Sequence, residues 1–163
     1  MQRCADIDWN TWQPAIRATL LFVLHDHRIL LIRKKRGFGV GKINGPGGKL
    51  APGESALQAA VREVEEEVGV TPLNARARGT LSFQFTDGLA LHVSVFTATE
   101  HTGELVESDE ALPFWADIAA LPYDEMWADD RVWLPHLLAG RDVTLRAVFA
   151  DDTMLDYTLV VEG

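Results

Sequence analysis

Four glutamates occupy five consecutive positions in the stretch REVEEEVG, residues 62–69. Glu63 and Glu67 are four residues apart, so on a helix their carboxylates face each other and weaken it by about a few tenths of a kcal/mol. A chain with a formal net charge of -9 gains nothing from such crowding unless something positive offsets it. Magnesium or manganese would do so, because hard divalent cations prefer oxygen ligands. The stretch therefore predicts a Mg2+ site that Mn2+ can also fill.

The sequence predicts that a helix over residues 55–68 carries these glutamates. Ser55 and Gln58 have the spacing of a capping box, and Gly69 fits the end of the helix. On this helix the apolar side chains form one stripe roughly 100° wide, which suits burial against a sheet. The stripe consists of Leu57, Ala60, Val61, Val64 and Val68.

Three of the four carboxylates lie on one flank of the apolar stripe. These are Glu63, Glu66 and Glu67, whereas Glu65 lies on the other side. Converging, half-buried carboxylates are costly unless a cation sits among them. The alternative is a solvated acidic face, which is the common role of a glutamate-rich helix. The metal interpretation predicts that the three carboxylates converge.

Strands dominate the rest of the chain. Residues 16–24 and 28–34 have the apolar pattern of a hairpin, and residues 35–55, with seven glycines and two prolines, are typical of a loop. A second helix over residues 128–140 contains Pro135, which shortens or kinks it. Further strands are predicted at 77–85, 89–98, 112–118, 142–150 and 153–161. The pattern predicts an α+β domain, in which helices pack on a mixed sheet.

Composition restricts the classes of partner. The 163 residues suit one domain, so we expect an N-terminal extension over residues 1–15 and a single domain over residues 16–163. There is no apolar run of ~20 residues and no signal-peptide pattern, and Cys4 is the only cysteine, so we expect a cytoplasmic, monomeric protein without membrane contact. The negative charge disfavours nucleic acid but permits a small phosphorylated ligand held through metal ions.

The residues flanking the glutamates resemble the complete Nudix box. Gly48, five residues, Glu54, seven residues and then REVEEEVGV match every fixed position of that motif. The resemblance implies a Nudix fold, an α/β/α sandwich with a mixed β-sheet, and hydrolysis of a nucleoside diphosphate linked to another group. It implies metal ligands at Glu63, Glu66, Glu67 and the Gly48 carbonyl. It also implies that Arg62 orients Glu63, that Glu54 supports it, and that Lys49 neutralises a phosphate or the leaving group.

Four other stretches are similar to the animal-type MutT homologues, which hydrolyse oxidised purine nucleoside triphosphates. They are KKRGFGVGKINGPGGK (34–49), VESDE (106–110), MWADDRVWLP (126–135) and LDYTL (155–159). This resemblance implies that water attacks the β-phosphorus of 8-oxo-dGTP or 2-hydroxy-dATP, giving the monophosphate and pyrophosphate in nucleotide-pool sanitation. Glu63 would generate the nucleophile, and Glu110 is a second metal ligand or an alternative base. The implied base pocket contains Thr19, Lys34, Phe38, Asn44, Phe83, Trp127, Asp129 and Asp130.

The chemistry of this set suits a purine. Trp127 and Phe83 can stack on or wall the base, and Asn44 offers a donor and an acceptor. Asp129 and Asp130 repel each other, so one keeps its proton in a desolvated pocket and the pair can read more than one purine edge. Each residue also has an ordinary structural role: the aromatic residues as core, Asn44 as a turn residue, Asp129 as a helix N-cap and Asp130 as a first-turn acid.

Three departures from the MutT-homologue pattern predict a looser base pocket. Ile43 replaces a tryptophan, Pro46 an aromatic residue and Ala111 a methionine. Two other functions therefore stay open: a Nudix pyrophosphatase of ADP-ribose or nucleotide sugars, and a noncatalytic nucleotide-sensing Nudix module. The intact box argues against the second, because loss of catalysis would free Glu63, Glu66 or Glu67 to change.

Overall fold

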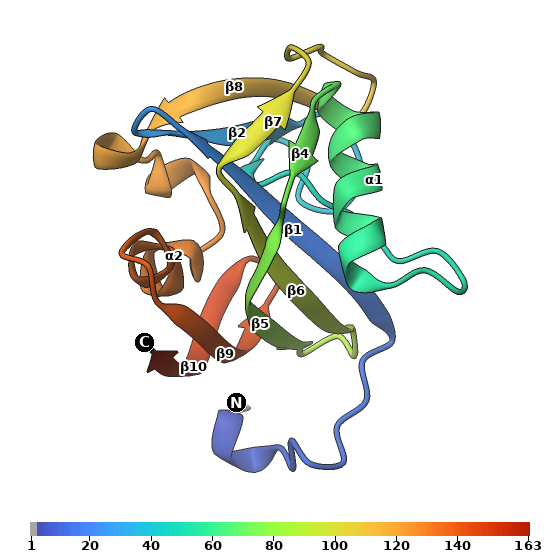
Figure 1. The fold of residues 1–163 in the computed structure, drawn as a ribbon. Helices are drawn as coiled ribbons and strands as arrows, with labels where there is room; N and C mark the ends of the chain where they lie inside the picture. The colour runs from blue at the N-terminus through green and yellow to red at the C-terminus, as the bar shows by residue number, and fades with distance from the viewer. Residues whose placement is uncertain (1–2) are drawn as a thin grey trace.

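Apolar runs rich in β-branched and aromatic residues form the strands of the computed structural model, which describes residues 3–163. Two α-helices and three short 3-10 helices (η1–η3) join them (Figure 1). In chain order the elements are η1 Cys4–Asp6, β1 Ile16–His25, β2 Arg28–Lys34, β3 Ile43–Asn44, α1 Ala56–Val68, β4 Thr71–Leu73, β5 Arg76–Phe85, β6 Ala90–Ala98, β7 Glu100–Thr102, β8 Ala111–Asp117, η2 Ile118–Ala120, η3 Tyr123–Glu125, α2 Asp130–Leu138, β9 Asp142–Ala150 and β10 Thr153–Glu162.

One mixed sheet organises the molecule. Its strand order is β10-β9-β5-β6-β1-β2-β3. Strand β8, which lies outside this order, also pairs with β2. The pairs β1–β6 and β5–β9 are parallel and the remaining pairs are antiparallel. A separate ribbon of β4 and β7, which the sequence did not predict, pairs Pro72 with His101. The predicted α+β class is confirmed.

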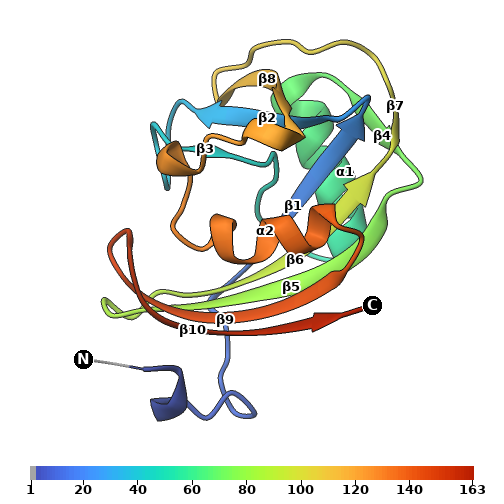
Figure 2. The same cartoon turned by 90° about the vertical axis from the view of Figure 1, so that its left-hand side faces the viewer.

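The sheet is covered by one helix on each face (Figures 1 and 2). Beneath α1 lies an apolar cluster that includes Leu21, Val64 and Phe96. The opposite cluster, which includes Trp133 of α2, Leu145 of β9 and Phe22 of β1, is larger. Side chains alternate along each strand, so successive residues of β1 supply both cores. This arrangement is the predicted α/β/α sandwich.

Helix α1 forms where its capping residues predict. The Ser55 hydroxyl accepts a hydrogen bond from the Gln58 N–H, and the Gln58 side chain accepts one from the Ser55 N–H. Gly69 ends the helix at φ 82°, a conformation that favours glycine. The predicted burial of Leu57 is wrong, because its side chain is 44% exposed beside the exposed loop residues 51–53. Ala59 is buried instead.

Helix α2 is shorter than the predicted range of 128–140. It begins at Asp130 and ends at Leu138, with Pro135 inside it. Gly140 follows the helix at φ 88°. Across residues 3–163, no helix has both the length and the apolar character that crossing a membrane requires.

The segment before β1 packs on the sheet face opposite α2 (Figure 2). The Trp12 indole N–H donates to the Gln84 side chain of β5 at 2.8 Å. The Arg146 guanidinium of β9 lies 5.5 Å from the ring of Trp9. The backbone N–H of Cys4 donates to Asp156 of β10. The two tryptophans therefore do pack on the body of the protein.

Arg78 of β5 joins the end of α2 to the sheet. Its guanidinium donates to the Asp142 carboxylate at 2.9 Å, to the Thr97 hydroxyl at 3.3 Å, and to the carbonyls of Leu137 and Arg141 at 3.4 and 3.0 Å. The Arg78 side chain is only 12% exposed, and its acceptors at Thr97 and Leu137 are part-buried, whereas those at Asp142 and Arg141 are exposed. Arg78 thus satisfies carbonyl groups at the C-terminal end of α2.

Replacing Arg78 with methionine is expected to lower the free energy of unfolding by about 2–3 kcal/mol, because the part-buried acceptors at Thr97 and Leu137 lose a charged donor. Arg76→Met, at an exposed position of the same strand, is the matched control and should cost less than ~0.5 kcal/mol. Urea unfolding of both variants measures the difference. Equal losses would show that Arg78 has no special role.

Candidate active site

The loop of residues 46–49 lies against β1 so closely that glycine is required. The Thr19 N–H donates to the Gly48 carbonyl at 2.9 Å, and the Leu21 N–H donates to the Pro46 carbonyl at 3.0 Å. A Cβ on Gly47 would stand 1.8 Å from the Thr19 carbonyl oxygen. A Cβ on Gly48 would stand 2.4 Å from the carboxyl carbon of Glu63. The loop therefore leaves room for Glu63 to press against the backbone of Gly48.

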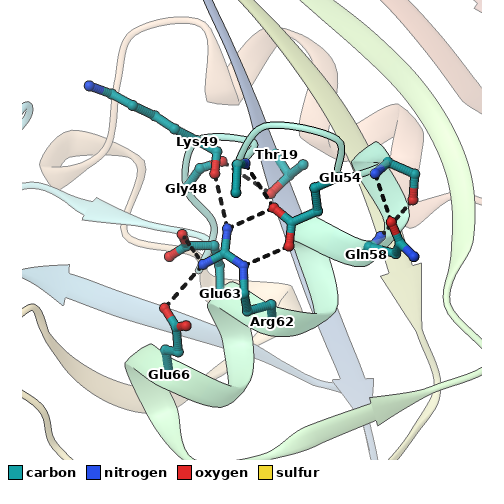
Figure 3. A network of polar contacts seen from close by, with 10 residues as sticks. Thr19, Gly48, Lys49, Glu54, Gln58, Arg62, Glu63 and Glu66 are labelled. Atoms are coloured by element: carbon teal, nitrogen blue, oxygen red, sulfur yellow. Dashed lines mark hydrogen bonds and ion pairs between the residues drawn. The ribbon is translucent and has the colours of Figure 1, made fainter.

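Arg62 is the centre of a polar network that joins this loop to α1 (Figure 3). Its Nε and Nη2 donate to both oxygens of Glu54 at 2.7 and 2.9 Å. Its Nη1 donates to Glu63 at 2.9 Å and to Glu66 at 3.1 Å, and its Nη2 donates to the Lys49 carbonyl at 3.2 Å. The Arg62 hydrogen bond lowers the pKa of Glu54 to about 2. One guanidinium thus fixes three box glutamates and the loop.

Glu67 faces the opposite way, into the protein. Its side chain is buried, and one oxygen accepts a hydrogen bond from the Gly47 N–H at 3.3 Å. Burial raises the pKa of Glu67 to about 7, and the charges of Glu63 and Glu110 add to the rise, whereas Lys34 and the Gly47 N–H oppose it. A nearby cation would therefore stabilise the ionised form of this buried carboxyl group.

The three glutamates do not converge as predicted. Within residues 3–163, no three acidic, histidine or cysteine side chains gather closely enough to form a metal cage. Mutual repulsion explains the separation: Glu63 and Glu66 share Arg62, while Glu67 turns to Gly47. The donor set nevertheless suits a divalent cation, because all its members are oxygen ligands and Glu67 is buried without a cationic hydrogen-bond partner.

Lys49 and Glu110 stand apart from this network. The side chain of Lys49 is exposed and points away from the glutamates (Figure 3), so only its carbonyl meets Arg62. Glu110 precedes β8 and pairs with Arg36, whose Nε donates to it at 2.9 Å. The Arg36 hydrogen bond lowers the pKa of Glu110, and the charges of Arg36 and Lys34 lower it further.

A cavity of about 140 Å³ opens beside the glycine loop. It is lined by every residue that the sequence assigned to the base pocket, together with Gly47 and Gly48 of the loop. The members from the sequence are Thr19, Lys34, Phe38, Asn44, Phe83, Trp127, Asp129 and Asp130. Base-sized space and the acidic helix therefore meet at the glycine loop.

Aromatic side chains wall the cavity. Trp127 stacks on Phe38 with ring centroids 5.1 Å apart and an interplanar angle of 17°. Phe85 and Phe149 meet Trp127 edge-on, and neither was predicted. Phe85 shares its strand face with Phe83, two residues earlier, so strand alternation alone could have indicated it. Phe149 lies opposite Phe85 through the parallel pairing of β9 with β5, for which the sequence carries no local signal.

The adjacent aspartates are fully enclosed. The Trp133 indole N–H donates to Asp129 at 2.8 Å. Asp129 occupies the predicted N-cap position of α2 and Asp130 is the predicted first-turn acid, but the Asp129 side chain makes no capping hydrogen bond. The Oδ2 atom of Asp130 is buried without a hydrogen-bond partner. Burial raises the pKa of Asp129 to about 6; burial and the Asp129 charge raise the pKa of Asp130 further above its ordinary value. The pair can hold a shared proton at neutral pH.

The next residues to place are Asn44 and the three positions that depart from the MutT-homologue pattern. Asn44 lies in β3 opposite Ile32, so it is not a turn residue, and its side-chain oxygen accepts from the Gly45 N–H. Ile43 and Ala111 are buried in the two apolar clusters, and the Pro46 carbonyl holds β1. None of these three lines the cavity, and the looser base pocket stays a prediction.

Comparison with known proteins agrees with this geometry. The NUDIX domain family matches residues 14–137. The chain is 46% identical over 121 residues to the oxidized purine nucleoside triphosphate hydrolase of Danio rerio, covering 74% of this chain and 78% of that protein. It is 39% identical over 143 residues to the hydrolase of the same name from Mus musculus, covering 86% and 92%.

Solved structures agree as well. The crystal structure of a MutT protein from Bacillus halodurans superposes with a TM-score of 0.80 at 31% identity, covering 88% of this chain and 97% of that chain. Sequence, fold and the placement of the box residues thus lead to one conclusion. The chain belongs to the Nudix hydrolase family.

Proposed function

We propose that this protein hydrolyses oxidised purine nucleoside triphosphates, such as 8-oxo-dGTP or 2-hydroxy-dATP, to the monophosphate and pyrophosphate. The observation that carries the proposal is that one cavity is lined by the aromatic walls, the aspartate pair and the glycine loop of the Nudix box together. A base held there directs its phosphates along the loop toward α1. The names of the two animal relatives support the same substrate class.

The proposed reaction is substitution at the β-phosphorus. A water oxygen bonds to this atom, and the bond to the oxygen that bridges it to the α-phosphate breaks, which releases the monophosphate. Glu63 accepts the proton of the water, and Arg62 holds its carboxylate in place. Glu110 is the alternative base, and Lys49 neutralises charge on the leaving group. Mg2+, or Mn2+ in its place, would be held by Glu63, Glu66, Glu67 and the Gly48 carbonyl, with Glu110 as a further ligand, and would neutralise phosphate charge.

The base would be read by its edge and its faces. Trp127 and the phenylalanines enclose the ring, and Asn44 retains a free amide N–H group for the edge. A protonated Asp130 donates to a purine oxygen, while an ionised Asp129 accepts from a ring or amino N–H. Movement of one proton between the two carboxyls allows the pocket to accept more than one oxidised purine.

The setting follows from this chemistry. We propose that the protein acts as a monomer in the cytoplasm, on free nucleotides rather than on nucleic acid or at a membrane, and so cleanses the nucleotide pool. Its negative surface charge disfavours a polynucleotide but tolerates one small anion that carries its own cations.

The direct test is pyrophosphate release with Mg2+ on 8-oxo-dGTP, 2-hydroxy-dATP, dGTP, dATP and ADP-ribose. A kcat/KM at least tenfold higher for an oxidised purine, about 1.4 kcal/mol of discrimination, is expected. Equal rates on ordinary nucleotides, or faster turnover of ADP-ribose, would leave the Nudix chemistry but remove the sanitation role. Binding without turnover would indicate a sensing module.

Replacing Glu63 with glutamine is expected to lower kcat by about a hundredfold or more while nucleotide affinity changes little, because the base is lost and the shape is kept. Glu65→Gln is the matched control, since the Glu65 side chain lies outside the Arg62 network and accepts a hydrogen bond from the Thr71 hydroxyl. Steady-state kinetics and a direct binding assay separate the two effects. Full activity in Glu63→Gln would assign the base elsewhere.

Asp129→Asn and Asp130→Asn should each change the ratio of kcat/KM between 8-oxo-dGTP and 2-hydroxy-dATP by about tenfold or more, because a fixed amide cannot exchange the proton. The pH profile of that ratio between pH 5 and 8 should flatten in both variants. The Trp133 bond to position 129 survives, since the asparagine oxygen still accepts it. Unchanged ratios and profiles in both variants would refute base reading by the pair.

The same groups predict how stability depends on pH in metal-free protein. Folding raises the pKa values of Asp129, Asp130 and Glu67, so the folded chain binds more protons than the unfolded chain above pH ~4. The free energy of unfolding should therefore fall by on the order of several kcal/mol from pH 5 to pH 8. Urea unfolding at both pH values tests this, and Asp130→Asn should lose less. A rise in the free energy of unfolding over this range would show that other interactions offset the cost of ionising the buried acids.

A further inference from the structure

Residues 35–42, here called the 35–42 loop, contact both ends of the site and are distinct from the glycine loop of residues 46–49. The loop leaves β2 after Lys34, whose strand neighbour is Ala111 at the start of β8. Further along, Phe38 stacks on Trp127 of the base cavity, and Lys42 lies 5.1 Å from the same ring. The start of the loop therefore lies beside Glu110, and its tip and end contact the base pocket.

Two ion pairs hold the start of the loop, and they differ in kind. Lys35 Nζ donates to Glu107 at 2.6 Å and to the Ser108 carbonyl at 2.8 Å, so it ties the loop to the segment before β8. Arg36 has side-chain hydrogen bonds to Glu110 alone. The side chains of Arg36 and Glu110 are 62% and 48% exposed, and an exposed pair of this type is easily exchanged.

Glu110 lies beside the cavity, because it precedes Ala111, the strand partner of the cavity residue Lys34. Its charge contributes to the raised pKa of Glu67, and Lys34, which lines the cavity, acts on both carboxylates. Arg36 therefore stands next to the acidic centre, on the side of the cavity where β2 meets β8. An incoming triphosphate carries several negative charges into a chain whose net charge is -9.

The cations available to that triphosphate are few. Arg62 is occupied by three glutamates, and Lys34 and Lys49 each offer a single ammonium group. A guanidinium matches phosphate oxygens with paired N–H donors, which a single ammonium cannot do. A phosphate group would thus compete well with Glu110 for Arg36.

We propose that Arg36 is a binding residue for the terminal phosphates: it exchanges Glu110 for the triphosphate, and Glu110 is released toward the reaction centre. This inference rests on the proposed function and deepens it, because it makes the number of phosphates a determinant of recognition. The monophosphate product lacks the groups that Arg36 binds, so the loop returns to Glu110 when pyrophosphate leaves.

The experiment measures nucleotide affinity in EDTA, where the phosphate bonds stay intact. Tryptophan fluorescence follows the binding of 8-oxo-dGMP, 8-oxo-dGDP and 8-oxo-dGTP to wild type, Arg36→Ala and Lys35→Ala. Arg36→Ala should weaken triphosphate binding about tenfold and monophosphate binding less than twofold. Lys35→Ala removes the same charge from the same loop and should change each affinity less than twofold.

A second variant tests the exchange itself. In Glu110→Gln the competitor of the triphosphate is weakened, so the triphosphate should bind about two- to threefold more tightly, and the monophosphate should be unaffected. Equal effects of Arg36→Ala and Lys35→Ala, or equal losses for all three nucleotides, would overturn the proposal. Failure of the proposed function would appear separately, as wild-type protein that binds the oxidised nucleotides but does not turn them over with Mg2+.

Discussion

The bonding of one guanidinium to three glutamates and a carbonyl is the constraint on which the site depends. Arg62 bonds Glu54, Glu63 and Glu66 and also reaches the backbone of Lys49. Helix α1 can therefore carry a crowded acidic face, because the repulsion among its glutamates is offset on one side by this cation. Arg62 also fixes the distance from α1 to the loop, since its guanidinium donates to glutamates of the helix and to the Lys49 carbonyl of the loop.

The sheet brings the second half of the site to this network. The parallel pairing of β1 with β6 and of β5 with β9 places Phe83 and Phe149 opposite the glycine loop, which is itself tied to Thr19 of β1. The N-terminal end of α2 then closes the cavity with Asp129 and Asp130, and Arg78 anchors the other end of this helix. The cavity that we propose for the base and the helix that we propose for phosphate chemistry thus belong to opposite cores of one sandwich.

Local signals predicted much of this arrangement. The capping box depends on residues near one another in the chain, so α1 and Gly69 followed from the sequence, and the contact of Arg62 with Glu63 followed from the resemblance to the Nudix box. Contacts between distant segments had no such signal. The short ribbon of β4 and β7 exists only through tertiary pairing, and the place of Ala111 under α1 depends on which face β8 turns inward.

The proposed reaction depends most directly on a divalent cation held by the acidic helix beside the cavity. Titration with Mn2+, followed by electron paramagnetic resonance, tests this on wild type, Glu67→Gln and Glu65→Gln. Glu67→Gln should bind Mn2+ about tenfold or more weakly, because a buried ligand is lost, while Glu65→Gln should match wild type. Equal Mn2+ affinity in all three proteins would contradict it.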